Sequence, residues 1–144
     1  MGYAFAKVDV WVGDTLNRPG SLARVLEALD AAGADLEFLV ARQVSRNTSR
    51  VFLSPLRTAA QRRAAADVGL VRAENMYSMR IEGPNKPGLA ARISRALADA
   101  GLNIRGVSAA RQNSKVALYF GFSSADDLKT AVRVAKRAVS GGAK

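Results

Sequence analysis

Apolar residues recur along this chain with two different periods. In the first stretch every second residue is apolar, the pattern of a half-buried β-strand, and these residues are Val8, Val10 and Val12. The spacing then changes to three and four, which predicts a helix with one apolar stripe formed by Leu22, Val25, Leu26 and Leu29. Gly33 follows where the end of a helix favours a left-handed residue, and another apolar strand starts at Leu36.

The same succession returns 68 residues later. Segment 17–36 reads NRPGSLARVLEALDAAGADL and aligns without a gap with segment 85–104, which reads NKPGLAARISRALADAGLNI. The flanking strands also match, with a shift of one residue, because Tyr77, Met79 and Ile81 repeat the first alternation. A turn, a helix, a glycine and two strands that recur in the same order indicate an internal duplication.

Each copy continues with a hairpin and a second helix. The hairpins are expected to turn at residues 45–49 and 113–114, and the second helices to cover residues 58–66 and 125–138. The first copy ends in a short strand near residues 68–73, which leads directly into the second copy. This pattern predicts an α+β fold of two ferredoxin-like βαββαβ modules, residues 1–74 and 75–144, each an antiparallel sheet with helices on one face.

The second module apparently lacks its last strand. After its second helix the chain reads Ser-Gly-Gly-Ala-Lys over residues 140–144, which is not a strand pattern. This leaves one edge of the sheet uncovered, and an unpaired edge invites pairing. We expect the residues before Val8, or another chain, to cover this edge, in a protein that is a homodimer.

Composition removes much of enzyme chemistry. The chain has neither cysteine nor histidine, so it lacks thiol nucleophiles, thiolate ligands and the commonest general base. The acidic residues Asp14, Glu82, Asp126 and Asp127 form no recognisable catalytic pair or metal-binding motif. No apolar run approaches the roughly 20 residues of a membrane span. We therefore expect a non-catalytic cytoplasmic protein without a metal or cofactor.

The repeated segment resembles the signature of the ACT domain, a βαββαβ regulatory module. The resemblance is carried by an alternating strand, the sequence Asn-(Arg/Lys)-Pro-Gly, an amphipathic helix and an Ala-Gly stop, and it covers residues 5–74 and 75–139. It implies a stand-alone tandem ACT protein that binds an amino acid or a similar small effector at the loop between the first strand and the first helix.

The residues of this loop have chemistry suited to such a ligand. If Pro19 and Pro87 occupy the first helical positions, their preceding basic residues are poor N-caps and leave first-turn amides free to bind a carboxylate. Asparagine offers both a donor and an acceptor. The candidate ligand-binding residues are Asn17, Arg18, Gly20, Ser21 and Leu36 in the first copy, and Asn85, Lys86, Gly88, Leu89 and Ile104 in the second.

Two other interpretations stay open. Each asparagine could simply cap its own helix around a tight turn, with nothing bound. The net charge of +10 also permits nucleic-acid binding, since residues 76–144 carry 12 basic and 4 acidic groups. Four of the basic groups would share one face of the last helix, where they could also be a solvated surface: Lys129, Arg133, Lys136 and Arg137.

Overall fold

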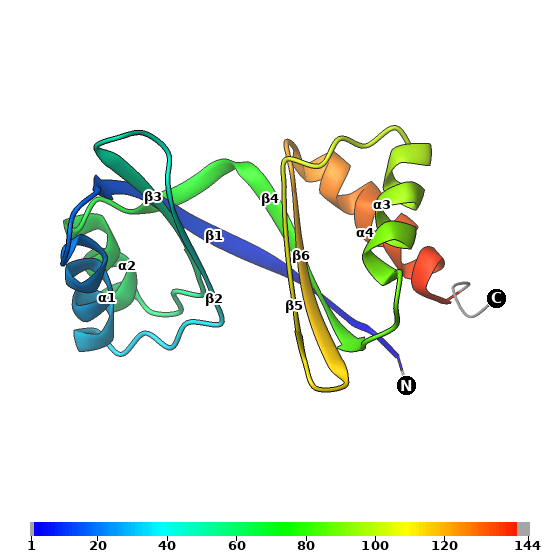
Figure 1. Cartoon of the computed structure of the whole chain (residues 1–144), viewed down its shortest axis with the longest axis horizontal. Helices are drawn as coiled ribbons and strands as arrows, with labels where there is room; N and C mark the ends of the chain where they lie inside the picture. The colour runs from blue at the N-terminus through cyan, green and yellow to red at the C-terminus, as the bar shows by residue number, and fades with distance from the viewer. Residues whose placement is uncertain (1, 141–144) are drawn as a thin grey trace. The chain divides into compact units, whose positions relative to one another are not determined.

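The computed structural model describes residues 2–140 as six strands and four helices (Figure 1). The elements of the first copy are β1 (Ala4–Leu16), α1 (Ser21–Ala31), β2 (Phe38–Gln43), β3 (Thr48–Ser54) and α2 (Ala59–Asp67). Those that follow are β4 (Val71–Pro84), α3 (Leu89–Asp99), β5 (Gly106–Gln112), β6 (Lys115–Phe122) and α4 (Ala125–Ser140). The hydrogen-bonded strand order is β2-β3-β1-β4-β6-β5. The α+β class and the repeated strand–helix–hairpin–helix unit are therefore confirmed.

The chain forms two compact units whose boundaries fall inside strands. The first unit is Asp9–Ala73; the second unit consists of residues from Glu74 onward together with the chain before Asp9. One boundary between the units falls near residue 74, and residues 2–8 group with the second copy. Strands β1 and β4 each contribute one part to each unit.

The first unit is a sheet covered on one face by α1 and α2. Strand β3 pairs with β1 on one side and β2 on the other, both antiparallel, with Val51 opposite Gly13 and Ala41. The core lies between the sheet and the helices and contains Val25, Leu29, Val51, Leu53, Leu56, Ala65 and Leu70. Trp11 packs against this core, while Val10 on the other side of the strand is 5% exposed. The period-two pattern predicted for the first strand is therefore confirmed, with side chains buried on both sides of β1.

The second unit has the same arrangement. Strand β6 pairs antiparallel with β4 and β5, and α3 and α4 supply the other half of the core. Its innermost side chains are fully buried, among them Ile81, Ile93, Leu97, Leu118 and Phe120. Helix α4 begins with the hydroxyl of Ser124 accepting from the N–H of Asp127 at 3.0 Å, a conventional N-cap.

The start of the chain supplies the strand that the second unit would otherwise lack. Tyr3 and Phe5 pack against its core, and the Tyr3 hydroxyl donates to the carbonyl of Pro84 at 2.6 Å. The edge beside β4 is thus covered by residues before Val8, one of the two expected solutions. A bare edge therefore gives no argument for a homodimer, which stays a prediction. Of residues 140–144, where no strand was expected, Ser140 is the last residue of α4 and residues 141–144 lie outside the described residues.

Candidate functional site

The Asn-Arg-Pro-Gly turn connects β1 to α1 and differs from expectation in where the helix begins. Helix α1 starts at Ser21, two residues after Pro19, and its N-cap is Gly20 with a φ of 89°. The N–H of Ser21 donates to the carbonyl of Arg18 at 3.3 Å, which closes a tight turn before the helix. Only glycine takes this left-handed conformation readily, so Gly20 belongs to the turn and Arg18 is not the N-cap.

The second copy repeats this geometry closely. Gly88 is the N-cap of α3, with a φ of 82°, and the N–H of Leu89 donates to the carbonyl of Lys86 at 3.1 Å. The amides of Ser21 and Leu89, which we expected to be free, are therefore occupied by the turn. The position of the repeat was predicted correctly, but both helix starts were placed two residues too early.

Neither turn provides a side-chain cap for the helix that follows it. The N-terminus of α1 and that of α3 make no side-chain capping hydrogen bond. In contrast, Thr58 caps α2 by accepting from the N–H of Gln61 at 3.1 Å. The asparagine of each turn consequently does not cap its own helix, whereas the tight turn of that alternative is present. The uncapped first turns retain the partial positive charge of a helix N-terminus.

Asn17 instead joins the turn to the hairpin between β2 and β3. Its Nδ2 donates to the carbonyl of Arg46 at 3.2 Å, and its Oδ1 accepts from the Ser49 hydroxyl at 3.2 Å. The backbone N–H of Asn17 donates to the carbonyl of Asn47 at 2.9 Å. In the second copy the N–H of Asn85 donates to the carbonyl of Ser114 at 2.8 Å, so both turns are attached to their hairpins.

A cavity of about 240 Å³ lies between this turn, the start of α1 and the hairpin strands. Asn17, Arg18 and Ser21, three of the predicted residues, contribute to its wall. The remaining lining residues are Thr15, Leu16, Leu22, Ala41, Arg42, Gln43, Ser49 and Val51. The only charged groups in this lining are two arginines, Arg18 and Arg42, so the cavity favours an anionic group.

The other predicted residues lie elsewhere. Leu36 and Ile104 precede β2 and β5 and pack against the cores of their units. Leu89 is 4% exposed and belongs to the core of the second unit. The equivalent residue of the first unit, Ser21, lines the cavity instead. The two turns are therefore unequal: in the first copy a hydroxyl side chain faces the cavity, while in the second a leucine is packed inward.

Sequence reasoning missed the part of the cavity formed by the hairpin. Arg42 and Gln43 were not among the predicted ligand-binding residues, yet both line the wall. A signal was present, because the pair recurs as Arg111-Gln112 at the matching place in the second copy. Which strand residues face a turn depends on sheet register, and here Gln43 pairs with Ser49 beside the turn.

Several acidic side chains in the described part of the chain form surface ion pairs, among them Asp14, Glu37 and Asp99. Asp14 accepts from the Arg50 guanidinium at 2.7 Å, and this hydrogen bond lowers the pKa of Asp14 from its ordinary value. Among residues 2–140 no group of three or more acidic side chains is placed to hold a metal ion. No helix in this part of the chain is long and apolar enough to cross a membrane.

Comparison with known proteins relates this fold to regulatory proteins. The ACT domain family model matches residues 77–137. No curated protein matches the sequence. Among solved structures, the chain is similar to protein BT0572 from Bacteroides thetaiotaomicron, with a TM-score of 0.77, 17% identity, and 92% of this chain and 89% of that chain covered.

Two aspartate kinase structures are also similar. The regulatory subunit from Thermus thermophilus, in its ligand-free form, gives a TM-score of 0.67 at 19% identity and covers 96% of this chain and 97% of its own. Aspartokinase III from E. coli, in complex with lysine and aspartate, gives 0.56 at 13% identity and covers 97% of this chain and 32% of its own. Residues 77–137 therefore match the ACT domain family model, and the whole chain shares the fold of these solved structures.

Proposed function

We propose that this protein is a non-catalytic regulatory protein that binds an amino acid in the cavity beside the first Asn-Arg-Pro-Gly turn. The observation that carries the proposal is the coincidence of that cavity with an uncapped helix start and two arginines. The regulatory ACT fold and the aspartate kinase structures with the same fold support the regulatory part. One of these structures contains lysine and aspartate, which supports an amino acid as the class of ligand.

The cavity chemistry matches both charged ends of an amino acid. The ligand carboxylate would lie near Arg18, Arg42 and the uncapped first turn of α1, where positive charge and backbone donors favour an anion. The ligand ammonium group would find neutral oxygen acceptors on Asn17, Gln43 and Ser49. A volume of about 240 Å³ lies below the roughly 300–1,000 Å³ typical of drug-sized ligands, so it suits a small molecule.

Only the first copy is proposed to bind at this turn. The first position of α1 presents Ser21 to the cavity, whereas the first position of α3 directs Leu89 into the core. The difference between Ser21 and Leu89 therefore alters the lining of the site, while the turn has the same conformation in both copies. Asn85, Lys86 and Gly88 have a structural role in this proposal, which consists of starting α3 and joining it to the β5–β6 turn.

A thermal-shift screen with the twenty amino acids, followed by calorimetry, tests this site. A ligand at one hundred times its Kd should raise the free energy of unfolding by about 2.7 kcal/mol. We expect Arg42→Gln and Ser21→Leu to weaken binding by about tenfold or more, since the first removes a charge and the second introduces the residue of the second copy. The matched control Asn85→Ala should bind like the unaltered protein.

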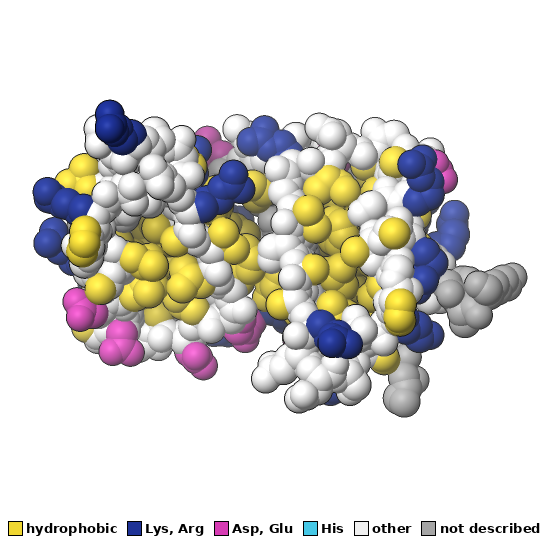
Figure 2. Space-filling model, in the orientation of Figure 1, with side chains coloured by type: hydrophobic (Ala, Val, Ile, Leu, Met, Phe, Trp, Pro, Cys, Tyr) yellow, Lys and Arg dark blue, Asp and Glu magenta, His cyan; other side chains and the backbone are white. Residues whose placement is uncertain are grey.

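Two results would contradict the proposal. Either no amino acid raises the melting temperature, or the Arg42→Gln and Ser21→Leu variants bind with unchanged affinity. Oligonucleotides belong in the same screen because α4 exposes its basic face, which lies on the helix side of the second unit (Figure 2). Stabilisation by oligonucleotides alone, falling steeply with salt, would favour the nucleic-acid interpretation instead.

A further inference from the structure

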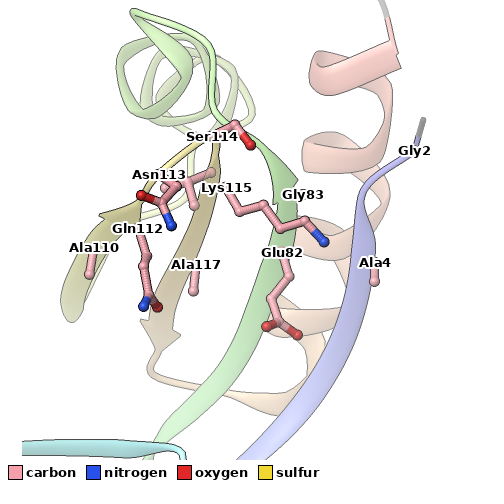
Figure 3. Close-up of a pocket in the computed structure, with 11 residues that line it drawn as sticks. Gly2, Ala4, Glu82, Gly83, Ala110, Gln112, Asn113, Ser114, Lys115 and Ala117 are labelled. Carbon is pink, nitrogen blue, oxygen red and sulfur yellow. The ribbon is translucent and has the colours of Figure 1, made fainter.

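A second cavity, of about 750 Å³, lies on the helix-free face of the second unit (Figure 3). Ala117 and Glu82 line it, and they alternate along their strands with Leu118 and Ile81, which are buried beneath the helices. Because successive side chains of a strand point to opposite faces, the cavity opens on the side of the sheet that α3 and α4 do not cover. It is separate from the turn site, and none of its lining residues belongs to the first unit.

The cavity exists because small side chains form its floor. In the strand register Ala117 of β6 lies opposite Glu82 of β4 on one side and Ala110 of β5 on the other. In Figure 3 Ala117 is seen between the side chains of Glu82 and Gln112. Two neighbouring methyl groups surrounded by longer polar side chains leave a hollow above the sheet. Its apolar floor and polar rim are the usual composition of a small-molecule site.

The rim carries charges of opposite sign on neighbouring strands. Glu82 has a half-exposed carboxylate that accepts from Arg80 through Oε1 at 3.0 Å. Lys115, two residues along β6 from Ala117, extends from the same face, and no carboxylate within residues 2–140 forms an ion pair with it. In Figure 3 the Lys115 side chain extends towards Gly83 of β4, while the amide side chains of Gln112 and Asn113 lie on the β5 side of the cavity.

The spacing of the two strand positions that carry these charges sets the size of the ligand. Glu82 and Lys115 occupy diagonal positions of an antiparallel pair, and residues at such positions are separated by roughly 7–8 Å. An extended dipeptide spans about 7 Å, from roughly 3.3–3.6 Å per residue. The cavity has about three times the volume of the one at the first turn, so it has room for this larger molecule.

We propose that this cavity binds a dipeptide-sized zwitterion with a free ammonium group and a free carboxylate. Glu82 accepts hydrogen bonds from the ligand ammonium group, while Lys115 pairs with the carboxylate and the amides of Gln112 and Asn113 donate to it. The small side chains of the ligand lie over Ala110 and Ala117. The proposal does not depend on the amino-acid site of the first unit, since the two sites share no residue.

Chemical-shift mapping of the ¹⁵N-labelled full chain tests this site with alanyl-alanine as the probe. We expect saturable shifts of the backbone amides of Ala110, Lys115 and Ala117. Glu82→Gln and Lys115→Met should each weaken binding by about tenfold or more, because each removes a hydrogen-bonded charge. Arg111→Met is the matched control: it removes a charge from β5, and it alternates with the two β5 residues that line the cavity, Ala110 and Gln112.

Three outcomes would overturn the proposal. These are the absence of saturable shifts in the millimolar range, equal binding of alanyl-alanine with both ends chemically capped, and an equal loss of affinity in Arg111→Met. Shifts confined to Ser21, Ala41 and Gln43 would also overturn it, since they place the dipeptide in the first cavity. The amino-acid proposal fails separately. In that case no amino acid shifts the amides around the first cavity, while alanyl-alanine still shifts the amide of Ala117.

Discussion

At the scale of single residues, glycine decides where the two repeated helices begin. Gly20 and Gly88 are left-handed and are each followed by a helix without a side-chain cap. The composition of the turn was visible in the sequence, but the position of the helix start was not. Proline is compatible both with the first helical position and with the corner of a tight turn, and only the hydrogen bond from Ser21 to Arg18 distinguishes the two.

Gly13 in β1 predicts a steric effect. A Cβ at this position would lie 2.5 Å from the carbonyl oxygen of Gly69 and 2.8 Å from Leu70 Cδ2. Since a backbone atom is involved, Gly13→Ala should lower the free energy of unfolding by about 1–3 kcal/mol. Gly106→Ala, whose Cβ would make only ordinary contact with Met76, is the control. Equal urea midpoints for the two variants would show that the backbone at Gly69 moves away from Gly13 at little cost.

The Asp14–Arg50 pair predicts a pH dependence. The hydrogen bond from Arg50 lowers the pKa of Asp14 in the folded state, so the pair stabilises the fold above the ordinary aspartate pKa. This contribution is lost as the pH falls through the lowered pKa. Urea unfolding of Asp14→Asn should therefore show a small loss of stability at neutral pH and none in acid. A difference that persists unchanged in acid would exclude the charge as its cause. Because both side chains are nearly half exposed, solvent screening keeps the effect small.

At the scale of elements, β1 differs most from what the sequence predicted. Its alternation was recognised from Val8 to Val12, but the strand begins at Ala4 and its first residues pack in the second unit. Local periodicity identifies a strand without identifying its neighbours, because pairing partners are chosen by long-range packing. The missing strand of the second copy was inferred correctly, and its replacement was one of two options that the sequence left open.

Phe5 provides a test of this replacement strand. Its ring packs against the core of the second unit and lies under Lys136, whose Nζ is 5.7 Å from the ring centroid. Phe5→Ala should lower the free energy of unfolding by about 1–3 kcal/mol, less than for a fully buried phenylalanine. The control Lys7→Ala alters an exposed side chain of the same strand and should change stability by about 0.5 kcal/mol or less. If the two variants unfold at the same urea concentration, the strand does not stabilise the second unit.

At the scale of the whole chain, two strands belong to both units. The boundaries fall between Val8 and Asp9 in β1 and between Ala73 and Glu74 in β4. The duplication itself was evident from the sequence because turn, helix and glycine recur in register. The sharing of strands between the units was not evident from the sequence, because the alternation of apolar residues continues through both boundaries and the composition does not change there.

Shared strands predict cooperative unfolding. If one unit unfolds, its parts of β1 and β4 lose their strand structure. The rest of each strand belongs to the other unit, which is therefore destabilised as well. Calorimetry should therefore record one transition, with equal calorimetric and van't Hoff enthalpies. Phe5→Ala, an alteration in the second unit alone, should lower the temperature of this transition without dividing it. Two separate transitions in either protein would show that the units unfold independently.

The N-terminal strand also has a consequence for how the repeat can be divided. In space the second unit follows the order β4, α3, β5, β6, α4 and then the first residues of β1, which is a complete βαββαβ module in circularly permuted form. A cut between the two sequence repeats, near residue 74, would separate this module from its final strand. Connecting residues 2–8 to the chain after Ser140 through a short linker would restore a linear βαββαβ module. The second module is therefore a circular permutation and not one continuous segment of the chain.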